Sequence, residues 1–212
     1  MKIAQDGWGF IILGIAVAAA GALSVRAFGA LSIVVAVLGG GFAGFSAYFF
    51  RDPERPLPTD PNKIYSPGDG TVLSVVKENG DGETVRIFLS IFNVHIQRAP
   101  CAGKVERVDY RTGSFKAAMV DGARENERNI VELAVRNRPE KVAVEQIAGL
   151  IARRIRCWIK AGDEIAAGAR YGLIQFGSQA AVHLPPSARA TVKPGDKVAA
   201  GITEIAQWIA DK

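Results

Sequence analysis

The sequence predicts a mainly β protein in which an antiparallel β-sandwich, or barrel-sandwich-like, domain follows an N-terminal hydrophobic helical hairpin. Two observations support this fold class. The first 50 residues contain only three charged side chains, Lys2, Asp6 and Arg26, although the chain has 26 basic and 21 acidic residues in all. Beyond residue 61, short runs rich in β-branched and aromatic residues alternate with turn-forming Gly, Pro, Asp and Asn. A chain of 212 residues has room for one ordinary domain and this appendage.

The hydrophobic hairpin is predicted over residues 1–50 from two uncharged runs, Gly7–Val25 and Ala27–Phe50. Each run is close to or above the roughly 20 residues that a membrane-spanning helix needs. Both runs are rich in Gly and Ala, which allow close packing of helices in a membrane. A secretory signal would contain one short apolar core instead of two long runs. We therefore expect a membrane-anchoring hairpin, with a re-entrant or interfacial element as the alternative.

The charges that flank these runs predict the orientation of the hairpin. Lys2 precedes the first run, and Arg51 and Arg55 follow the second, which by the positive-inside tendency places both ends in the cytoplasm. Arg26, at the far turn, argues against this orientation. The segment 51–61 contains four prolines, so it cannot form a regular helix and is predicted to be a stiff linker.

The domain over residues 62–212 is predicted to be a half-buried antiparallel sheet, because its apolar residues recur with a period of two. Only Thr203–Ala210 and part of Phe115–Arg128 are candidates for helices. The predicted strands are Thr71–Lys77, Thr84–Ile91, Lys104–Tyr110, Asn129–Val135, Lys141–Ile147 and Ile151–Ile159.

A short internal repeat, Gly-Asp-x-(Ile/Val)-x-x-Gly, occurs in Lys160–Gly168 and again in Lys193–Gly201. Each copy predicts a turn, a short strand and a second turn. The pattern resembles the turns of lipoyl- and biotinyl-type β-sandwich domains and favours a shared architecture. The alternative is two unrelated β-turns, because Gly-Asp is common in turns.

The composition excludes several kinds of site. Two cysteines, Cys101 and Cys157, exclude a disulfide scaffold and a CxxC metal site. Two histidines, His95 and His183, leave little for a histidine-rich metal centre, so we expect no metal. The net charge of +5 is spread among interspersed charges of both signs, which favours an anionic membrane surface over nucleic acid as a partner.

The dipeptide Gly177-Ser178 lies between two predicted strands and is a candidate for chemistry. A glycine before a serine at a bend permits a strained peptide bond, whose carbonyl the hydroxyl can attack. An N-to-O acyl shift followed by elimination would leave dehydroalanine, which hydrolyses to a pyruvoyl group. This reaction needs a base, which His95 with Asp69 would supply. Gly-Ser is a common dipeptide, and a single histidine on a strand or an aspartate in a turn is usually structural.

Five segments, in the same order along the chain, resemble motifs of the phosphatidylserine decarboxylases, specifically the short prokaryotic form. They cover nearly the whole chain and are Phe49–Arg55, Ser66–Val72, Phe88–His95 with Arg98–Pro100, Asn126–Asn129 and Phe176–Ser178. The resemblance implies a lyase of the prokaryotic inner membrane, with its catalytic domain on the cytoplasmic side. It also implies the reaction, which is decarboxylation of phosphatidylserine to phosphatidylethanolamine and CO2.

The resemblance further implies autocatalytic cleavage between Gly177 and Ser178. Ser178 then becomes the pyruvoyl N-terminus of an α chain, 178–212, and residues 1–177 become the β chain. This covalent pyruvoyl group would form a Schiff base with the substrate amine and accept the electrons released as CO2 leaves. We also expect a phospholipid substrate, a homo-oligomer and no nucleic-acid partner.

Two further residues have roles that the resemblance implies. Asp69 corresponds to the acid of the cleavage machinery, and His95 corresponds to the histidine of the active-site strand and is the candidate general acid. Longer members of the family have a second histidine where this chain has Arg98, and an aspartate where it has Asn93. Either His95 serves both cleavage and decarboxylation, or cleavage needs less help from a base.

Two other functions are alternatives at this stage. One is a membrane-anchored β-sandwich adaptor without enzymatic activity, suggested by the hairpin and the repeat. The other is a serine hydrolase that uses Ser178, His95 and Asp69, although the chain lacks a Gly-x-Ser-x-Gly motif around the serine. Neither alternative requires the chain to be cut before Ser178, so chain cleavage distinguishes both from a pyruvoyl enzyme.

Overall fold

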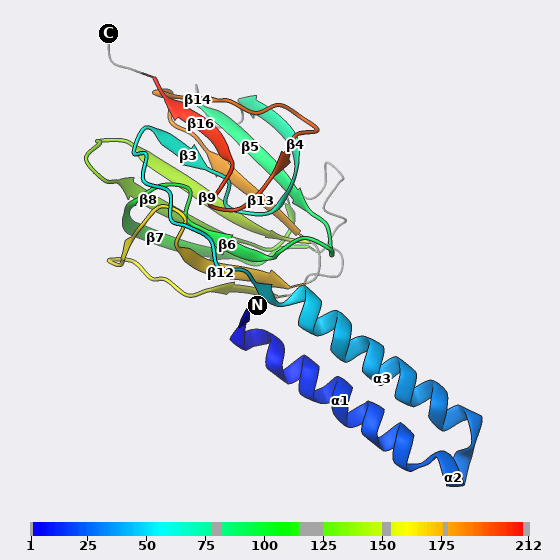
Figure 1. The fold of residues 1–212 in the computed structure, drawn as a ribbon. Helices are drawn as coiled ribbons and strands as arrows, with labels where there is room; N and C mark the ends of the chain where they lie inside the picture. Colours follow the sequence, from blue (N-terminus) through cyan, green and yellow to red (C-terminus); the bar gives the residue numbers. More distant parts are fainter. Residues whose placement is uncertain (1, 78–81, 115–124, 150–153, 176–177, 210–212) are drawn as a thin grey trace. The chain divides into compact units, whose positions relative to one another are not determined.

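The computed structural model describes residues 2–77, 82–114, 125–149, 154–175 and 178–209. The chain divides into two compact units, Met1–Glu54 and Arg55–Lys212 (Figure 1). The first unit is helical, and the second consists of strands that are all paired antiparallel. The predicted fold class, mainly antiparallel β with an N-terminal helical hairpin, is confirmed.

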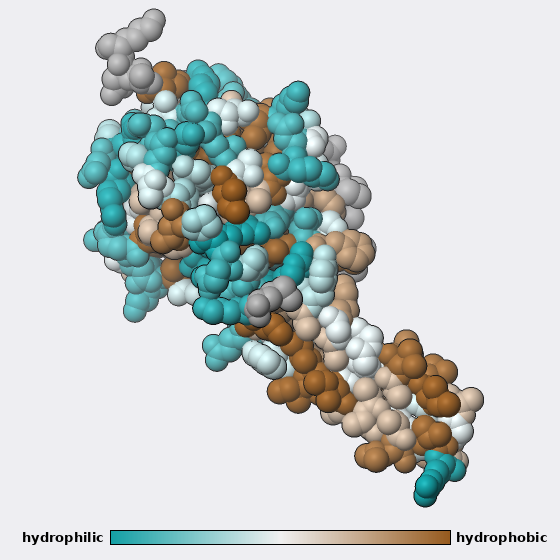
Figure 2. Space-filling model, viewed as in Figure 1, coloured by the Kyte–Doolittle hydropathy of each residue, from teal (hydrophilic) through white to brown (hydrophobic). Residues whose placement is uncertain are grey.

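The first unit is a hairpin of two long helices, α1 (Trp8–Leu23) and α3 (Ala30–Phe49), joined by the short α2 (Val25–Phe28). Its open end is closed by β1 (Lys2–Ile3), which pairs with β2 (Arg51–Asp52). Residues of η1 (Gln5–Gly7) form a turn of 3-10 helix before α1. Segments Gln5–Leu23 and Ala30–Phe49 are long and apolar enough to span a membrane. Figure 2 shows an apolar surface along both helices, to which exposed side chains such as Leu13, Leu23, Leu31 and Leu38 contribute.

Small residues line the contact between α1 and α3. A Cβ atom on Gly21 would lie 2.5 Å from the backbone nitrogen of Ala36, and one on Gly39 would lie 2.5 Å from that of Ala18. Only glycine permits so close an approach, which explains why these apolar runs are rich in small residues.

We expect Gly39→Leu to force the two helices apart, because the new side chain would overlap the backbone of α1. Overpacking of this kind typically costs about 1–3 kcal/mol. Gly40→Leu is the matched control, because a Cβ on Gly40 would have no atom within 4 Å. Limited proteolysis in detergent should cut the hairpin of Gly39→Leu faster than that of Gly40→Leu. Equal cutting rates would contradict the close contact.

The second unit is built on an eight-stranded antiparallel sheet (Figure 1). From one edge to the other its strands are β11 (Glu164–Ile165), β7 (Gly103–Arg111), β8 (Arg128–Val135), β9 (Lys141–Ala148), β13 (Ser178–His183), β5 (Glu83–Leu89), β4 (Gly70–Lys77) and β15 (Lys197–Val198). Alternate residues of the central strands are fully buried and form the core, among them Val85, Ile87, Val144 and Val182. This alternation is the period of two in the sequence.

Two three-stranded sheets complete the second unit. One contains β10 (Arg154–Cys157), β12 (Arg170–Gln175) and β6 (Ile96–Arg98), and the other contains β14 (Ala188–Ala190), β16 (Glu204–Trp208) and β3 (Lys63–Tyr65).

Most of the predicted strands form, but one predicted helix does not. The segment Thr203–Ala210 contains β16, which pairs with β14 and with β3, so the helix prediction there was wrong. Its closely spaced apolar residues resembled a helical face, and backbone pairing with two distant strands decided its conformation. Most of the other candidate helix, Phe115–Arg128, lies outside the described residues, and Arg128 begins β8.

The two copies of the Gly-Asp repeat fold in the same way. The carboxylates of Asp163 and Asp196 each accept a hydrogen bond of 2.9 Å from the backbone N–H three residues earlier. Gly162 and Gly195, which precede them, have φ angles of 96° and 94°, a left-handed conformation that favours glycine. The copies lead into β11 and β15, the two edge strands of the eight-stranded sheet, so the repeat forms the predicted turn, strand and turn.

Candidate active site

Ser178 begins β13 in the middle of the eight-stranded sheet. Its backbone is paired with Leu89 at the end of β5 and with Ala148 at the end of β9. Side chains alternate along a strand, so Ser178 lies on the same face as Ala180 and Val182, which belong to the hydrophobic core. Ser178 is fully buried, and its Oγ has no hydrogen-bond partner among the described residues. Gly177 lies outside the described residues.

Two connections in the chain join the eight-stranded sheet to the small sheet of β10, β12 and β6. Strand β5 of the large sheet is followed by β6 of the small one, and β12 of the small sheet is followed by β13 of the large one. Strand β5 pairs with β13 in the large sheet, and β6 pairs with β12 in the small one. One connection therefore runs from Leu89 to His95 and the other from Ile174 to Ser178. They are joined at one end by the Leu89–Ser178 pair and at the other by a 3.4 Å hydrogen bond from the Ile174 N–H to the His95 carbonyl. The topology thus brings His95 and Ser178 to one crossing, defined here as residues 89–97, 174–175 and 178.

The His95 imidazole is fully buried within this crossing. Its Nδ1 lies 3.0 Å from the carbonyl oxygen of Asn93. Because a carbonyl can only accept, Nδ1 carries the proton of this bond, and in the neutral ring Nε2 carries the lone pair. His95 lies opposite Ile174 in the register, on the face where Ile174 packs against Ala148 of the large sheet. The ring is therefore on the side of the small sheet that faces Ser178.

Asp69 ends a turn, residues 66–69, that packs against the crossing. A Cβ atom on Gly68 would lie 3.2 Å from the side chains of both Gln97 and Leu89. The Asp69 carboxylate forms a two-point ion pair with the Arg55 guanidinium, with N–O distances of 2.7 and 2.8 Å. It also accepts a hydrogen bond of 2.8 Å from the backbone N–H of Ala200. The sequence associated Asp69 with His95, whereas these bonds tie it to Arg55 and to the end of the second Gly-Asp repeat.

Comparison with known proteins identifies the family of this chain. The family model for phosphatidylserine decarboxylase matches residues 42–206. Phosphatidylserine decarboxylase proenzymes of Burkholderia vietnamiensis, Burkholderia lata and Burkholderia multivorans are each 41% identical over 218 residues, which cover 97% of this chain and 95% of each relative. The chain belongs to the phosphatidylserine decarboxylase family. It is therefore an enzyme, and the alternative of a non-enzymatic adaptor was wrong.

The two residues at which the enzyme departs from longer family members have structural partners. The Asn93 side chain accepts a hydrogen bond of 2.9 Å from the Ser90 N–H and closes the turn between β5 and β6. Arg98 is buried and donates to the carbonyl oxygen of Gly168 at 2.9 Å. The guanidinium of Arg98 stays protonated, so it cannot replace a histidine as a base.

The second histidine of the enzyme, His183, lies at the far end of β13 and on the face opposite to Ser178. Its Nδ1 is 3.0 Å from Thr84 Oγ1, and its Nε2 is 3.4 Å from a carboxylate oxygen of Glu145. Arg128 and Arg86 lie 3.6 and 3.9 Å from the same carboxylate. His183 therefore belongs to a cluster of ionisable side chains across β8, β9, β13 and β5, away from the crossing.

This cluster predicts a pH-dependent contribution to stability. Burial alone would raise the pKa of Glu145, but His183, Arg128 and Arg86 hold that pKa below its ordinary value. A carboxyl whose pKa is lowered by folding stabilises the fold at neutral pH, and this contribution is lost as the pH falls through the lowered pKa. Glu145→Gln should cost about 3 kcal/mol at pH 7, because it removes the buried carboxylate that Arg86, Arg128 and His183 face.

The prediction is checked by thermal unfolding in detergent. The melting temperature of Glu145→Gln should lie well below that of the wild type at pH 7. The difference between the two melting temperatures should become smaller below about pH 4.3, the ordinary pKa of a glutamate carboxyl. Glu164→Gln is the control, since Glu164 pairs with Arg136 at the exposed surface, where ion pairs contribute little. A gap that does not change with pH would contradict the role assigned to Glu145.

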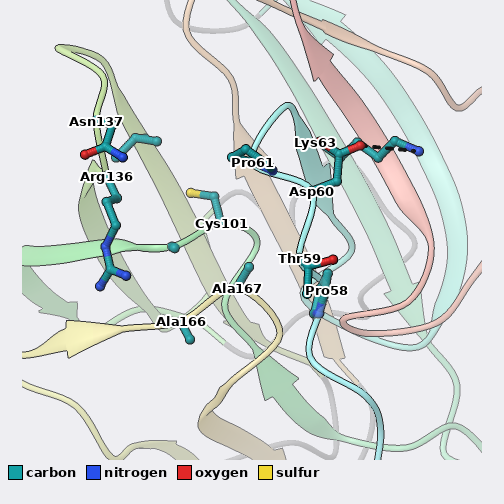
Figure 3. A pocket seen from close by; sticks show the side chains of 12 residues that line it. Pro58, Thr59, Asp60, Pro61, Lys63, Cys101, Arg136, Asn137, Ala166 and Ala167 are labelled. Carbon is teal, nitrogen blue, oxygen red and sulfur yellow. Dashed lines mark ion pairs between the residues drawn. The ribbon is translucent and has the colours of Figure 1, made fainter.

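A pocket of about 280 Å³ lies elsewhere in the second unit and has no lining residue in the crossing (Figure 3). Its charged side chains already have partners, Arg136 with Glu164, and Lys63 with both Asp60 and Glu204. Burial raises the pKa of its cysteine, Cys101, to about 12, so that thiol stays protonated and unreactive. Within the described ranges, no group of three or more His, Cys, Asp or Glu residues could hold a metal ion.

Sequence reasoning missed two residues of this site, one that binds Asp69 and one in the crossing. Arg55, the partner of Asp69, stands at the end of a segment that resembled the family but was first assigned to the linker. Gln97 lies two positions after His95, so on an extended strand the two side chains share a face. That spacing was a usable signal, although burial of Gln97 depends on tertiary packing.

Proposed function

We propose that the enzyme is made as a proenzyme, cuts itself between Gly177 and Ser178, and decarboxylates phosphatidylserine with the pyruvoyl group formed from Ser178. The observation that carries this proposal is the fully buried Ser178 hydroxyl, which has no hydrogen-bond partner among the described residues and shares a crossing with His95. A buried hydroxyl without a partner is unfavourable, which is consistent with a group that is consumed in a reaction.

The surroundings of Ser178 fit the group that would replace its side chain. A pyruvoyl group keeps the carbon skeleton of serine, so it needs no more room than Ser178 occupies. Its neighbours Leu89, Ala148 and Ala180 are apolar and fully buried, which keeps water from the reacting atoms. When formed, the group supplies an electrophilic carbonyl and an acceptor for the electrons that decarboxylation releases.

In this proposal His95 transfers protons, and Asp69 holds a neighbouring turn in position. The Nε2 atom of His95 would take the proton from the Ser178 hydroxyl as it attacks the Gly177 carbonyl. Elimination then releases the Gly177 carboxylate, and hydrolysis of the remaining dehydroalanine releases ammonia. In decarboxylation, His95 would hold the proton that the substrate carbon needs after CO2 leaves. Asp69, bound to Arg55, would keep the turn 66–69 against the crossing as a positioning residue.

The intact mass of the purified protein tests this proposal. We expect two chains, residues 1–177 and residues 178–212, with the shorter chain lacking a free amine at its N-terminus. A serine hydrolase would leave a single chain. A free serine amine on an active enzyme would overturn the pyruvoyl assignment.

We further propose that residues 1–50 anchor the enzyme in the prokaryotic inner membrane, with residues 51–61 as a linker and residues 62–212 as the cytoplasmic catalytic domain. The two long apolar helices and their exposed leucine, isoleucine and valine side chains support an anchor. An anchored site stays close to a lipid substrate that hardly leaves the bilayer, which raises its effective concentration. A homo-oligomer stays a prediction from the family resemblance.

Deleting residues 1–50 should move the protein from the membrane fraction to the soluble fraction. Basic side chains of the second unit, such as Arg154 and Arg156, would add only attraction to anionic lipid that salt screens. The measurement is fractionation of cell extracts in high salt, with the full-length chain as the control. Retention of the shortened protein in high-salt membranes would show that the hairpin is not the principal anchor.

A further inference from the structure

Gln97 carries a buried amide at the crossing that nothing in the described part of the chain satisfies. The residue lies in β6 and is fully buried, and neither its Oε1 nor its Nε2 has a hydrogen-bond partner in the part of the chain that the structure describes. It lies two positions after His95, whose carbonyl accepts a hydrogen bond from Ile174 of β12, so the two side chains are on the same face of the small sheet. A Cβ on Gly68 would lie 3.2 Å from Gln97 Nε2 and 3.2 Å from the Leu89 side chain.

Leaving both ends of an amide without partners in a protein interior is costly, and folded proteins rarely do so. The amide can donate two hydrogen bonds and accept two. Leu89, beside it, is the residue paired with Ser178. Gln97 therefore lies near the position where the reacting end of the substrate would be bound, and its amide has no hydrogen-bond partner among the described residues.

We propose that Gln97 binds the carboxylate of the serine headgroup through its Nε2–H groups, an inference that rests on the proposed function. In the substrate, the amine and the carboxylate share one carbon atom, which must lie next to the group formed from Ser178. The carboxylate carbon is one bond from that carbon, whereas the phosphorus is three bonds from it. The carboxylate is therefore the anionic part of the headgroup closest to Gln97.

A neutral donor also suits a carboxylate that is about to be lost. Its negative charge leaves that group as CO2 forms, so a cation placed there would stabilise the ground state more than the transition state. The neighbouring guanidinium groups bind protein oxygens instead, Arg98 that of Gly168 and Arg55 those of Asp69. The uncharged amide can orient the carboxylate while stabilising the ground state less than a cation would, so it raises the barrier to loss of CO2 less.

The experiment compares Gln97→Met with wild type in the full-length enzyme, using phosphatidylserine in detergent micelles as substrate and phosphatidylethanolamine as inhibitor. Met fills a similar volume without hydrogen bonds. We expect normal chain cleavage, a KM for phosphatidylserine raised about 10- to 100-fold, as for a lost hydrogen bond to a charged group, and an unchanged inhibition constant for phosphatidylethanolamine, which has no carboxylate. Gln207→Met, at an exposed position of β16, is the matched control and should behave as wild type.

The other outcomes overturn the assignment. If Gln97→Met weakens the binding of both lipids equally, Gln97 contacts the phosphate that they share. If it weakens the binding of neither lipid, Gln97 is structural. If Gln97→Met is not cut, the same comparison is made on Gln97→Asn, which keeps the amide but withdraws it from the carboxylate. If neither variant is cut, the amide serves cleavage instead of headgroup binding. Failure of the proposed function is distinguishable, because wild type itself would then remain uncut or release no CO2.

Discussion

Ser178→Ala is expected to leave a single chain of 212 residues without decarboxylase activity. Alanine has no hydroxyl to attack the Gly177 carbonyl, so neither the cut nor the pyruvoyl group can form. The change itself is well tolerated by the fold, because it removes a buried oxygen that has no partner in the described structure. A denaturing gel reports the cleavage, and CO2 release from phosphatidylserine reports the activity.

Ser187→Ala is the matched control for this prediction. Ser187 follows β13 in the chain, and its Oγ is also buried without a described partner. This variant should be cut as wild type is and should keep its activity. Cleavage of Ser178→Ala at the same bond would show that another nucleophile, or a protease, makes the cut.

His95→Ala is expected to lower CO2 release per pyruvoyl group by about 10²- to 10⁴-fold, the usual cost of losing one general acid. The ring is fully buried and its Nδ1 is held by the Asn93 carbonyl, so Nε2 is the atom that would take up a proton and give it to the substrate carbon. Cleavage should also be slower, although water can assist that step. The assay isolates the cut fraction and divides the rate by its pyruvoyl content.

His183→Ala separates a chemical role of His95 from a general effect of removing a histidine. His183 lies on the opposite face of β13, where it pairs with Glu145. Its loss should lower thermal stability but leave the rate per pyruvoyl group within a few-fold of wild type. A His95→Ala rate that is also within a few-fold of wild type would show that His95 is structural, and the proton donor would then have to be sought elsewhere.

Local patterns in the sequence predicted much of this fold. The two uncharged runs became α1 and α3, and the period of two became β4, β5, β7, β8 and β9, because each signal comes from residues close together in the chain. The helix prediction at Thr203–Ala210 was wrong because the conformation of this segment is set by residues far away in the chain. Its conformation as β16 depends on pairing with β14 and β3, and β3 lies far away in the sequence.

The sequence by itself determined the membership of this chain in its family and the candidates Ser178, His95 and Asp69, since short motifs carry that information. The tertiary structure alone decided what these residues face. It bound Asp69 to Arg55, turned His183 away from Ser178, and buried the Gln97 amide beside Leu89. These outcomes depend on which distant strands pair, because each pairing fixes the face to which every side chain of a strand points.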